Sequence, residues 1–253
     1  MAYHEGELEV QARAGVASPR IGVRDAIPPA AAELLAAQRV VIAASTDAAG
    51  RIWASLLTGE PGFARAVDWQ EIHITPAAGN EVFDGDVGLL AIEFATRRRM
   101  RINGRLRHED KTLVVETREV YSNCPQYITP QAVAIPTLAR PSKGALLDDE
   151  QLAFIRAADT FFIATAHPET GADASHRGGP AGFVQAEPER LWWADYPGNN
   201  MFNTLGNLAV NPHCGLLFTD FARTLQLTGT ASIEWDGTER AVAFSVEEVL
   251  YTT

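Results

Sequence analysis

Cysteine is scarce in this chain. Two cysteines, Cys124 and Cys214, occur in 253 residues, which is too few for a disulfide framework and is typical of a reducing cytoplasm. No stretch approaches the roughly 18 consecutive apolar residues of a membrane-spanning helix. The first fifteen residues contain acids and no long apolar run, so no signal peptide is expected. We therefore expect a cytoplasmic protein without a membrane partner.

Positive charge is also in deficit. The 21 Lys and Arg residues face 32 Asp and Glu residues, which gives a net charge of -11. A protein that binds a polyanion must gather cationic side chains to displace its counterions. The composition therefore opposes non-specific binding to nucleic acid or anionic lipid.

Several motifs of catalysis are missing. The sequence has no G-x-x-x-x-G-K-[ST], no G-x-S-x-G, no C-x-x-C and no H-E-x-x-H. The run GGPAG has the wrong spacing for a dinucleotide fingerprint, and a proline interrupts it. We expect no metal site, and the sequence assigns no catalytic residue.

What the chain does contain is an internal duplication. Residues 40–63 and 161–183 align with one gap, and matches recur further on in the same order, with glycines aligned on glycines. The matched pairs include Ile42 with Ile163, Gly50 with Gly171, Ser55 with Ser175, Gly62 with Gly182, Gly88 with Gly215, and Gly104 with Gly229.

Each copy has the same predicted plan. A short apolar helix comes first, then a strand-length apolar run, a turn, a second strand, a Gly-Pro turn and further strands rich in β-branched and aromatic residues. Without βαβ alternation, these strands predict antiparallel meanders closed into small barrels. The predicted fold class is mainly β with flanking helices. The predicted boundaries are an N-terminal arm (1–27), a degenerate first unit (28–122), a proline-rich connector (123–146) and a second unit (147–253).

The second copy carries an insertion, YPGNNMFNTLGNLAVNP. It predicts a helix that has Asn199 or Asn200 as its N-cap, Asn203 and Thr204 in its early turns, and its end at Asn211. A helix start rich in amide donors is suited to an anion, but simple capping explains the asparagines equally well when they are taken alone.

A second difference lies in a strand. Leu56-Leu57-Thr58 in the first copy is replaced by His176-Arg177-Gly178 in the second. An apolar pair thus becomes a titratable group, a fixed cation and a glycine that lets a ligand approach the backbone. Arg177 alone is typical of a solvated strand, but its position beside Ser175 and the asparagine-rich helix start favours a phosphate-binding role.

The run ATRRRMRINGRLR shows strand alternation. Met100 and Ile102 fall on one face, and Arg99, Arg101 and Asn103 fall on the other. One interpretation is a solvated basic face. The other is that Arg99 or Arg101 crosses to the second unit, toward an anion held there.

The motifs ASHRGGPAGFV, LWWADYPGNNMFNTLGNLAVNPHCGLLF and LQLTGTA resemble those of the pyridoxamine 5'-phosphate oxidase-like proteins, in particular their oxidase-related branch. The resemblance covers roughly 70 residues of the second copy. It implies two tandem split β-barrel units that form an intramolecular pseudo-dimer, with one FMN in the second unit. Asn203 and Thr204 replace an Arg-Lys pair of the true oxidases, and Thr224 replaces a glutamine, so the vitamin-forming reaction is not implied.

The motifs and the resemblance together give a predicted cofactor-binding set: Ser175, His176, Arg177, Gly178, Asp195, Asn199, Asn200, Asn203, Thr204, Thr224, Gln226, Arg99 and Arg101. His176 is the one candidate acid-base group. The predicted function is an FMN-dependent oxidoreductase that acts on a small molecule, with NAD(P)H or a reductase as partner. The alternative is a non-catalytic flavin- or haem-binding carrier, or a component of a reductase system. A monomeric pseudo-dimer and a homodimer are both compatible with the duplication.

Overall fold

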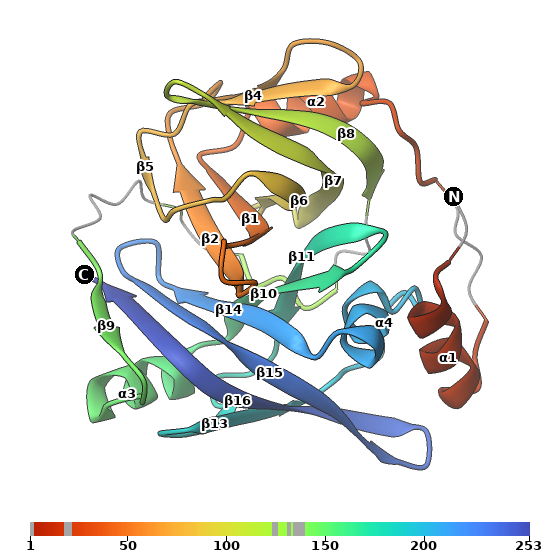
Figure 1. The fold of residues 1–253 in the computed structure, drawn as a ribbon, viewed down its shortest axis with the longest axis vertical. Helices are drawn as coiled ribbons and strands as arrows, with labels where there is room; N and C mark the ends of the chain where they lie inside the picture. The colour runs from red at the N-terminus through yellow and green to blue at the C-terminus, as the bar shows by residue number, and fades with distance from the viewer. Residues whose placement is uncertain (1–2, 18–21, 123–125, 131–132, 134–139) are drawn as a thin grey trace.

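A computed structural model describes residues 3–17, 22–122, 126–130, 133 and 140–253. The chain forms two β units, one above the other in Figure 1, with the N-terminal helix beside the second. Parts of the predicted connector, and Cys124 with them, lie outside the described residues. Among the described residues, no helix is both long and apolar enough to span a membrane.

The first unit begins with one helix and continues with strands. Its elements are α2 (Pro29–Ala36), β1 (Val40–Thr46), β2 (Ile52–Thr58), β3 (Ala64–Ala66), β4 (Glu71–Ile74), β5 (Ala78–Gly79), β6 (Gly85–Glu93), β7 (Arg98–Glu109) and β8 (Thr112–Ser122).

The second unit repeats this order, except that a helix, α4 (Asn203–Val210), stands where the first unit has the short strand β5. Its elements are α3 (Asp149–Ala157), β10 (Thr160–His167), β11 (Gly171–Gly178), β12 (Gln185–Glu187), β13 (Arg190–Ala194), α4, β14 (His213–Thr219), β15 (Thr224–Asp236) and β16 (Glu239–Thr252). Two further elements flank the units: α1 (Glu5–Arg13) and β9 (Ser142–Gly144), which pairs with β16.

The two sheets share one topology apart from an extra edge strand in the first. The strand order is β3-β4-β8-β7-β6-β1-β2-β5 in the first unit and β12-β13-β16-β15-β14-β10-β11 in the second, and the pairings between named strands are antiparallel. The register of β7 with β8 shifts at Gly104, and that of β15 with β16 shifts at Gly229. A bulge at the same place in both copies confirms the duplication. The fold is a tandem pair of split β-barrel units.

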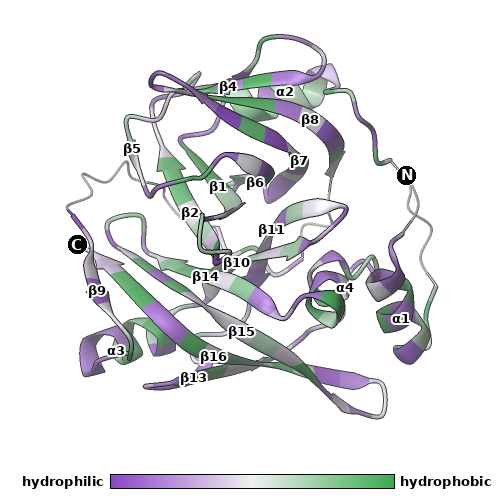
Figure 2. Ribbon diagram, viewed as in Figure 1, coloured by the Kyte–Doolittle hydropathy of each residue, from purple (hydrophilic) through white to green (hydrophobic). Residues whose placement is uncertain are grey.

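Apolar residues form three cores. One lies inside each unit, and the third lies between them, where alternate residues of β1 and β2 meet those of β10 and β11. Figure 2 shows hydrophobic residues along β1 and β2 at this junction. Because alternate strand residues face opposite sides, each inner hairpin packs both on its own barrel and on the other unit. The pseudo-dimer is therefore contained in one chain.

The matched pair Gly88 and Gly215 explains why the units approach so closely. A Cβ at Gly88 would lie 2.6 Å from the carbonyl oxygen of Ala172, and one at Gly215 would lie 2.5 Å from that of Ile52. Each glycine lets the partner unit's hairpin cross directly over the backbone. The two contacts are related by the pseudo-twofold relation between the units.

Candidate functional site

A pocket opens where β11 and the segment before α4 face β7 of the first unit. The predicted residues that line it come from both units: Arg99, Arg101, His176, Arg177, Gly178, Asp195, Asn199, Asn200, Asn203 and Thr204. Ser175 lies directly behind it, where its hydroxyl bonds the Thr204 hydroxyl at 2.8 Å and accepts from the Arg101 guanidinium. The structure thus brings most of the predicted set together.

The basic strand β7 supplies the contribution of the first unit. Met100 and Ile102 enter the core of that unit, as the alternation predicts, and the arginines on the opposite face reach β11. Arg101 bonds Ser175, and Arg99 Nη1 lies 3.3 Å from His176 Nδ1. Both arginines therefore cross between the units, and the basic face is not simply solvated.

Two predicted residues lie elsewhere. Gln226 donates from Nε2 to the carbonyl oxygen of Ala54, and Thr224 accepts from Asn80 Nδ2. In the alignment of the two copies, Gln226 on β15 matches Arg101 on β7, and Thr224 matches Arg99. Because the two units are related by a pseudo-twofold axis, Gln226 and Thr224 lie on the opposite side of the interface from the two arginines. They line or border a second pocket, not the one at His176.

The start of α4 differs from the prediction. The helix begins at Asn203, and its N-cap is Phe202, which has a φ of 58° and makes no side-chain capping bond. Neither Asn199 nor Asn200 is the N-cap, because the helix begins after both of them. Asn199 Oδ1 instead accepts from the backbone N–H of Met201 in a local turn. Asn200 and Phe202 both have left-handed backbone. For a non-glycine residue this conformation costs of order 1–3 kcal/mol. This wall of the pocket is held by surrounding contacts.

Two further predicted details are also revised. The Asn203 amide already has an acceptor within the protein, since its Nδ2 donates to the Glu7 carboxylate oxygen Oε1 at 2.8 Å. Gly178 does allow a close backbone approach, but what approaches it is the carbonyl group of Tyr127 in the connector.

His176 is the most unusual group in the pocket. Its side chain is 5% exposed, and the Arg99 guanidinium donates toward Nδ1, which assigns the ring proton to Nε2. That Nε2 is buried and has no hydrogen-bond partner among the described residues. Burial, with added repulsion from Arg99 and Arg177, lowers the pKa of His176 to about 3. The ring is neutral at pH 7 and presents an unsatisfied N–H donor.

The pocket is electropositive. Among the described residues that line it are four guanidinium groups, those of Arg99, Arg101, Arg177 and Arg240, and one carboxylate, that of Asp195. Behind this lining, Arg101 Nη1 lies 3.7 Å from the Asp173 carboxylate. Arg240 Nε bonds the Asp195 carboxylate at 2.8 Å, whereas Arg177 Nε lies 3.7 Å from it. Desolvation lowers the pKa of Arg177, and Asp195 opposes this effect. Such a concentration of cations in an acidic protein is suited to an anion.

The second pocket has the opposite character. It is larger, about 480 Å³ against about 110 Å³, and its charged lining residues are Asp47, Arg51, Glu81, Lys143 and Glu248. Arg51 is already bonded to Asp47 at 2.8 Å and to Glu248. Between these two pockets, volume alone would favour the second, but charge and the unsatisfied donor favour the pocket at His176.

Sequence reasoning missed three groups near the site. Arg240 lies in a strand without a distinctive motif, and Tyr127 lies in the connector, where its ring stacks on that of Tyr196 with centroids 5.5 Å apart. Glu7 belongs to α1 and is 1% exposed. The buried residues Gly6, Glu7, Val10 and Gln11 recur at helical spacing, and that spacing was the available signal for a docked arm.

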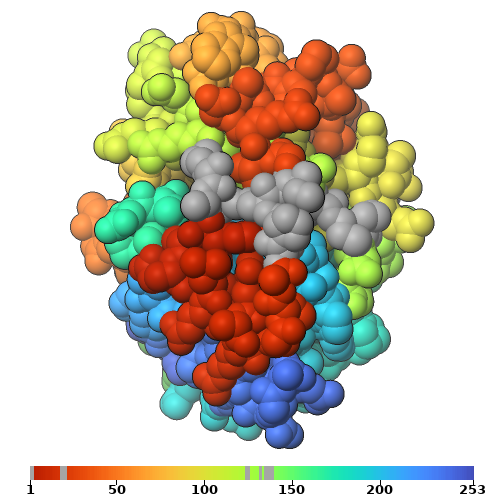
Figure 3. Space-filling model, turned by 90° about the vertical axis from the view of Figure 1, so that its right-hand side faces the viewer, coloured from red at the N-terminus to blue at the C-terminus, as the bar shows by residue number. Residues whose placement is uncertain are grey.

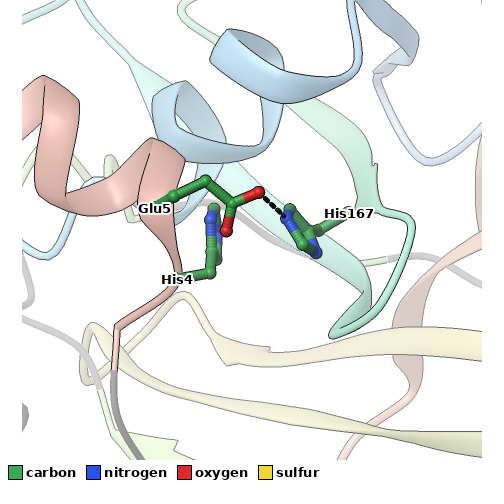
Figure 4. Close-up of side chains that lie close together, drawn as sticks. All are labelled: His4, Glu5 and His167. Atoms are coloured by element: carbon green, nitrogen blue, oxygen red, sulfur yellow. Dashed lines mark hydrogen bonds and ion pairs between the residues drawn. The ribbon is translucent and has the colours of Figure 1, made fainter.

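One cluster outside the pocket has residues that often bind metals. His4, Glu5 and His167 lie together where α1 meets the end of β10 (Figure 4). The two imidazole rings are 4.2 Å apart and tilted by only 32°, so their in-plane lone pairs do not converge. His167 Nδ1 accepts from the backbone N–H groups of Glu169 and Thr170, which leaves its proton on the nitrogen that faces Glu5. We assign this cluster to the docking of α1.

Comparison with known proteins finds a family match for the second unit. Residues 147–250 match the family model described as pyridoxamine 5'-phosphate oxidase. This part of the chain belongs to the pyridoxamine 5'-phosphate oxidase-like split-barrel family. No curated protein matches the chain.

Solved structures show weaker likenesses. HupZ from Group A Streptococcus is 12% identical, covers 41% of this chain and 98% of its own, and has a TM-score of 0.34. A Clostridium acetobutylicum protein of the pyridoxinephosphate oxidase family is 15% identical, with a TM-score of 0.32. The match covers 42% of this chain and 89% of that protein. A FAD-binding protein from Mesorhizobium loti is 9% identical, with a TM-score of 0.29. The match covers 45% of this chain and 98% of that protein. These scores are low, so the family assignment depends on the sequence match.

Proposed function

We propose that the chain is an FMN-binding flavoprotein whose phosphate site is the pocket at His176. The observation that carries the proposal is the buried Nε2–H of His176, which has no acceptor among the described residues and lies in a pocket with four arginines. A buried donor without a partner costs free energy that a phosphate oxygen would recover. The family match of residues 147–250 supports a flavin nucleotide as the source of that phosphate.

The residues fit a phosphate group. His176, Arg99 and Arg177 offer N–H donors, and donors of this kind form short, strong bonds to phosphate oxygens. A cavity of about 110 Å³ holds such a group but is smaller than the ~300–1,000 Å³ of most small-molecule sites. The flavin ring would therefore occupy the open side, where Tyr127 and Tyr196 border the pocket.

The chemistry proposed is oxidoreduction of a small molecule, with NAD(P)H or a reductase as electron donor. Bound FMN would supply the hydride or electron transfer, and the chain would supply binding, orientation and electrostatics. His176 would act as a hydrogen-bond donor and not as an acid, since its pKa of about 3 keeps it neutral. We propose that the second unit binds one FMN per chain, that no second copy is needed, and that the protein works in the cytoplasm.

The test compares FMN with riboflavin, which lacks the phosphate. Flavin fluorescence titrations measure both affinities in the wild type, in Arg177→Ala and in the control Arg51→Ala, which alters the pseudosymmetric pocket. Loss of a charge-assisted bond of about 1.5–3 kcal/mol predicts 10- to 150-fold weaker FMN binding in R177A, with riboflavin unchanged. Equal wild-type affinity for the two flavins, or FMN affinity unchanged in R177A, refutes the site.

A second readout separates the alternatives for function. A bound flavin that is bleached by NADPH or NADH supports an oxidoreductase. A flavin that stays oxidised with every donor tested supports the carrier alternative.

A further inference from the structure

The N-terminal helix α1 lies directly on α4, although the two are about 200 residues apart in sequence. Figure 3 shows the N-terminal segment, in red, lying against the second unit. A Cβ on Gly6 would collide with the carbonyl oxygen of Gly206, and one on Gly206 would lie 2.7 Å from the backbone nitrogen of Glu7. The two backbones therefore touch, and neither glycine can be enlarged without separating the helices.

Glu7 is the polar centre of this contact. One carboxylate oxygen accepts from Asn203 Nδ2 at 2.8 Å, and the other accepts from the backbone N–H of His4 at 3.0 Å. His4 Nε2 in turn lies 3.1 Å from Asn207 Oδ1, one turn further along α4. The helix start is thus bonded to α1 at a fully buried carboxylate.

Asn203 stands where the segment that lines the pocket enters the helix α4. It is the first residue of α4 and follows the left-handed Phe202, whose side chain forms no cap for the helix. Thr204, the next residue, bonds Ser175, which bonds Arg101. A side chain that fixes Asn203 therefore fixes both the left-handed entry of α4 and the residue that connects it to the arginines.

We propose that Glu7 is a positioning residue for the anion pocket. Its buried carboxylate holds Asn203, and through Asn203 it keeps the entry of α4 in the shape that forms one wall of the site. This inference rests on the proposed function only for the identity of the ligand. The geometric part, that Glu7 orders residues 199–206, holds for the protein without flavin.

The experiment uses the full chain and three variants. Glu7→Ala removes the acceptor, and Glu7→Gln keeps an oxygen that can accept from Asn203. Glu9→Ala is the matched control, because Glu9 is exposed on the same helix. Hydrogen exchange of the flavin-free protein reports on residues 199–206, and titrations with FMN and riboflavin report on the pocket.

We expect E7A to exchange residues 199–206 at least tenfold faster, with β10 unchanged. FMN affinity should fall about tenfold, equivalent to about 1.4 kcal/mol, while riboflavin affinity changes less than threefold. E7Q should restore most of both properties, and E9A should match the wild type. If E7A does not fold, Asn203→Ala removes the same bond from the other side and gives the same readouts.

Two results overturn the inference: unchanged exchange of residues 199–206 in E7A or N203A, or an equal loss of FMN and riboflavin affinity. The second result would mean that Glu7 only stabilises the fold. A wild type that binds neither flavin refutes the proposed function instead, and exchange alone then decides the role of Glu7.

Discussion

Replacing His176 with phenylalanine tests the central group of the pocket, because the two expected effects have opposite signs. The unsatisfied Nε2–H costs the unliganded protein about 1–3 kcal/mol. His176→Phe removes that donor and keeps a ring to contact Phe162, whose centroid is 5.8 Å away. It also removes the bond from the charged Arg99 guanidinium, which at 3.3 Å is worth about 1.5 kcal/mol, the lower end of the range for a charged donor. The net expectation is an unliganded protein more stable by up to about 1.5 kcal/mol.

Ligand binding should change in the other direction. A hydrogen bond from His176 to a phosphate oxygen is worth about 1.5–3 kcal/mol, so H176F should bind FMN 10- to 150-fold more weakly. Calorimetry of the flavin-free protein should show a melting temperature raised by up to about 6 °C, given about 2–4 °C per kcal/mol for a chain of about this size.

The control is His213→Phe, at an exposed strand start. A flavin-free H176F protein that is clearly less stable, together with unchanged FMN affinity, would show that His176 is an ordinary satisfied core residue. That outcome would refute the reasoning.

Three further predictions concern pH, packing and thiol reactivity. The pKa of His176 is about 3 in the folded protein and near 6.5 in the unfolded chain. The unfolded chain therefore takes up the proton first, and the free energy of unfolding should fall as the pH drops from about 6.5 to 3. Unfolding free energies at pH 7 and 4.5 check this, and H176F should show a smaller drop. Gly215→Ala should destabilise by about 1–3 kcal/mol, since its Cβ would meet β2, whereas Gly198→Ala in open space should be near neutral in urea unfolding. Burial raises the pKa of the Cys214 thiol, so a thiol reagent should modify it only on unfolding, and fast labelling of the native protein would contradict the packing of β14.

The duplication is the part of the fold that the sequence predicts best. Matched glycines such as Gly88 and Gly215, or Gly104 and Gly229, mark close approaches and bulges that the barrel requires, so the chain repeats them. Strand alternation also placed Arg99 and Arg101 on the face that meets the second unit. These features are local patterns with direct geometric meaning.

The remaining details depend on tertiary contacts. The start of α4 was mispredicted because the asparagines favour capping locally, whereas the contacts of Asn203 with Glu7 and of Phe202 with Arg240 hold a left-handed entry. Thr224 and Gln226 were grouped with the site because the sequence does not show which copy's strand faces which pocket. The role of α1 was missed because its partners lie about 200 residues away.

The most direct measurement of the central claim is the visible spectrum of freshly purified protein, followed by extraction and identification of the chromophore. We expect one FMN per chain in the wild type and in the R51A control, and little in a variant that lacks both Arg99 and Arg177. A colourless wild-type protein that does not take up FMN, or full flavin content in the double variant, would contradict the account.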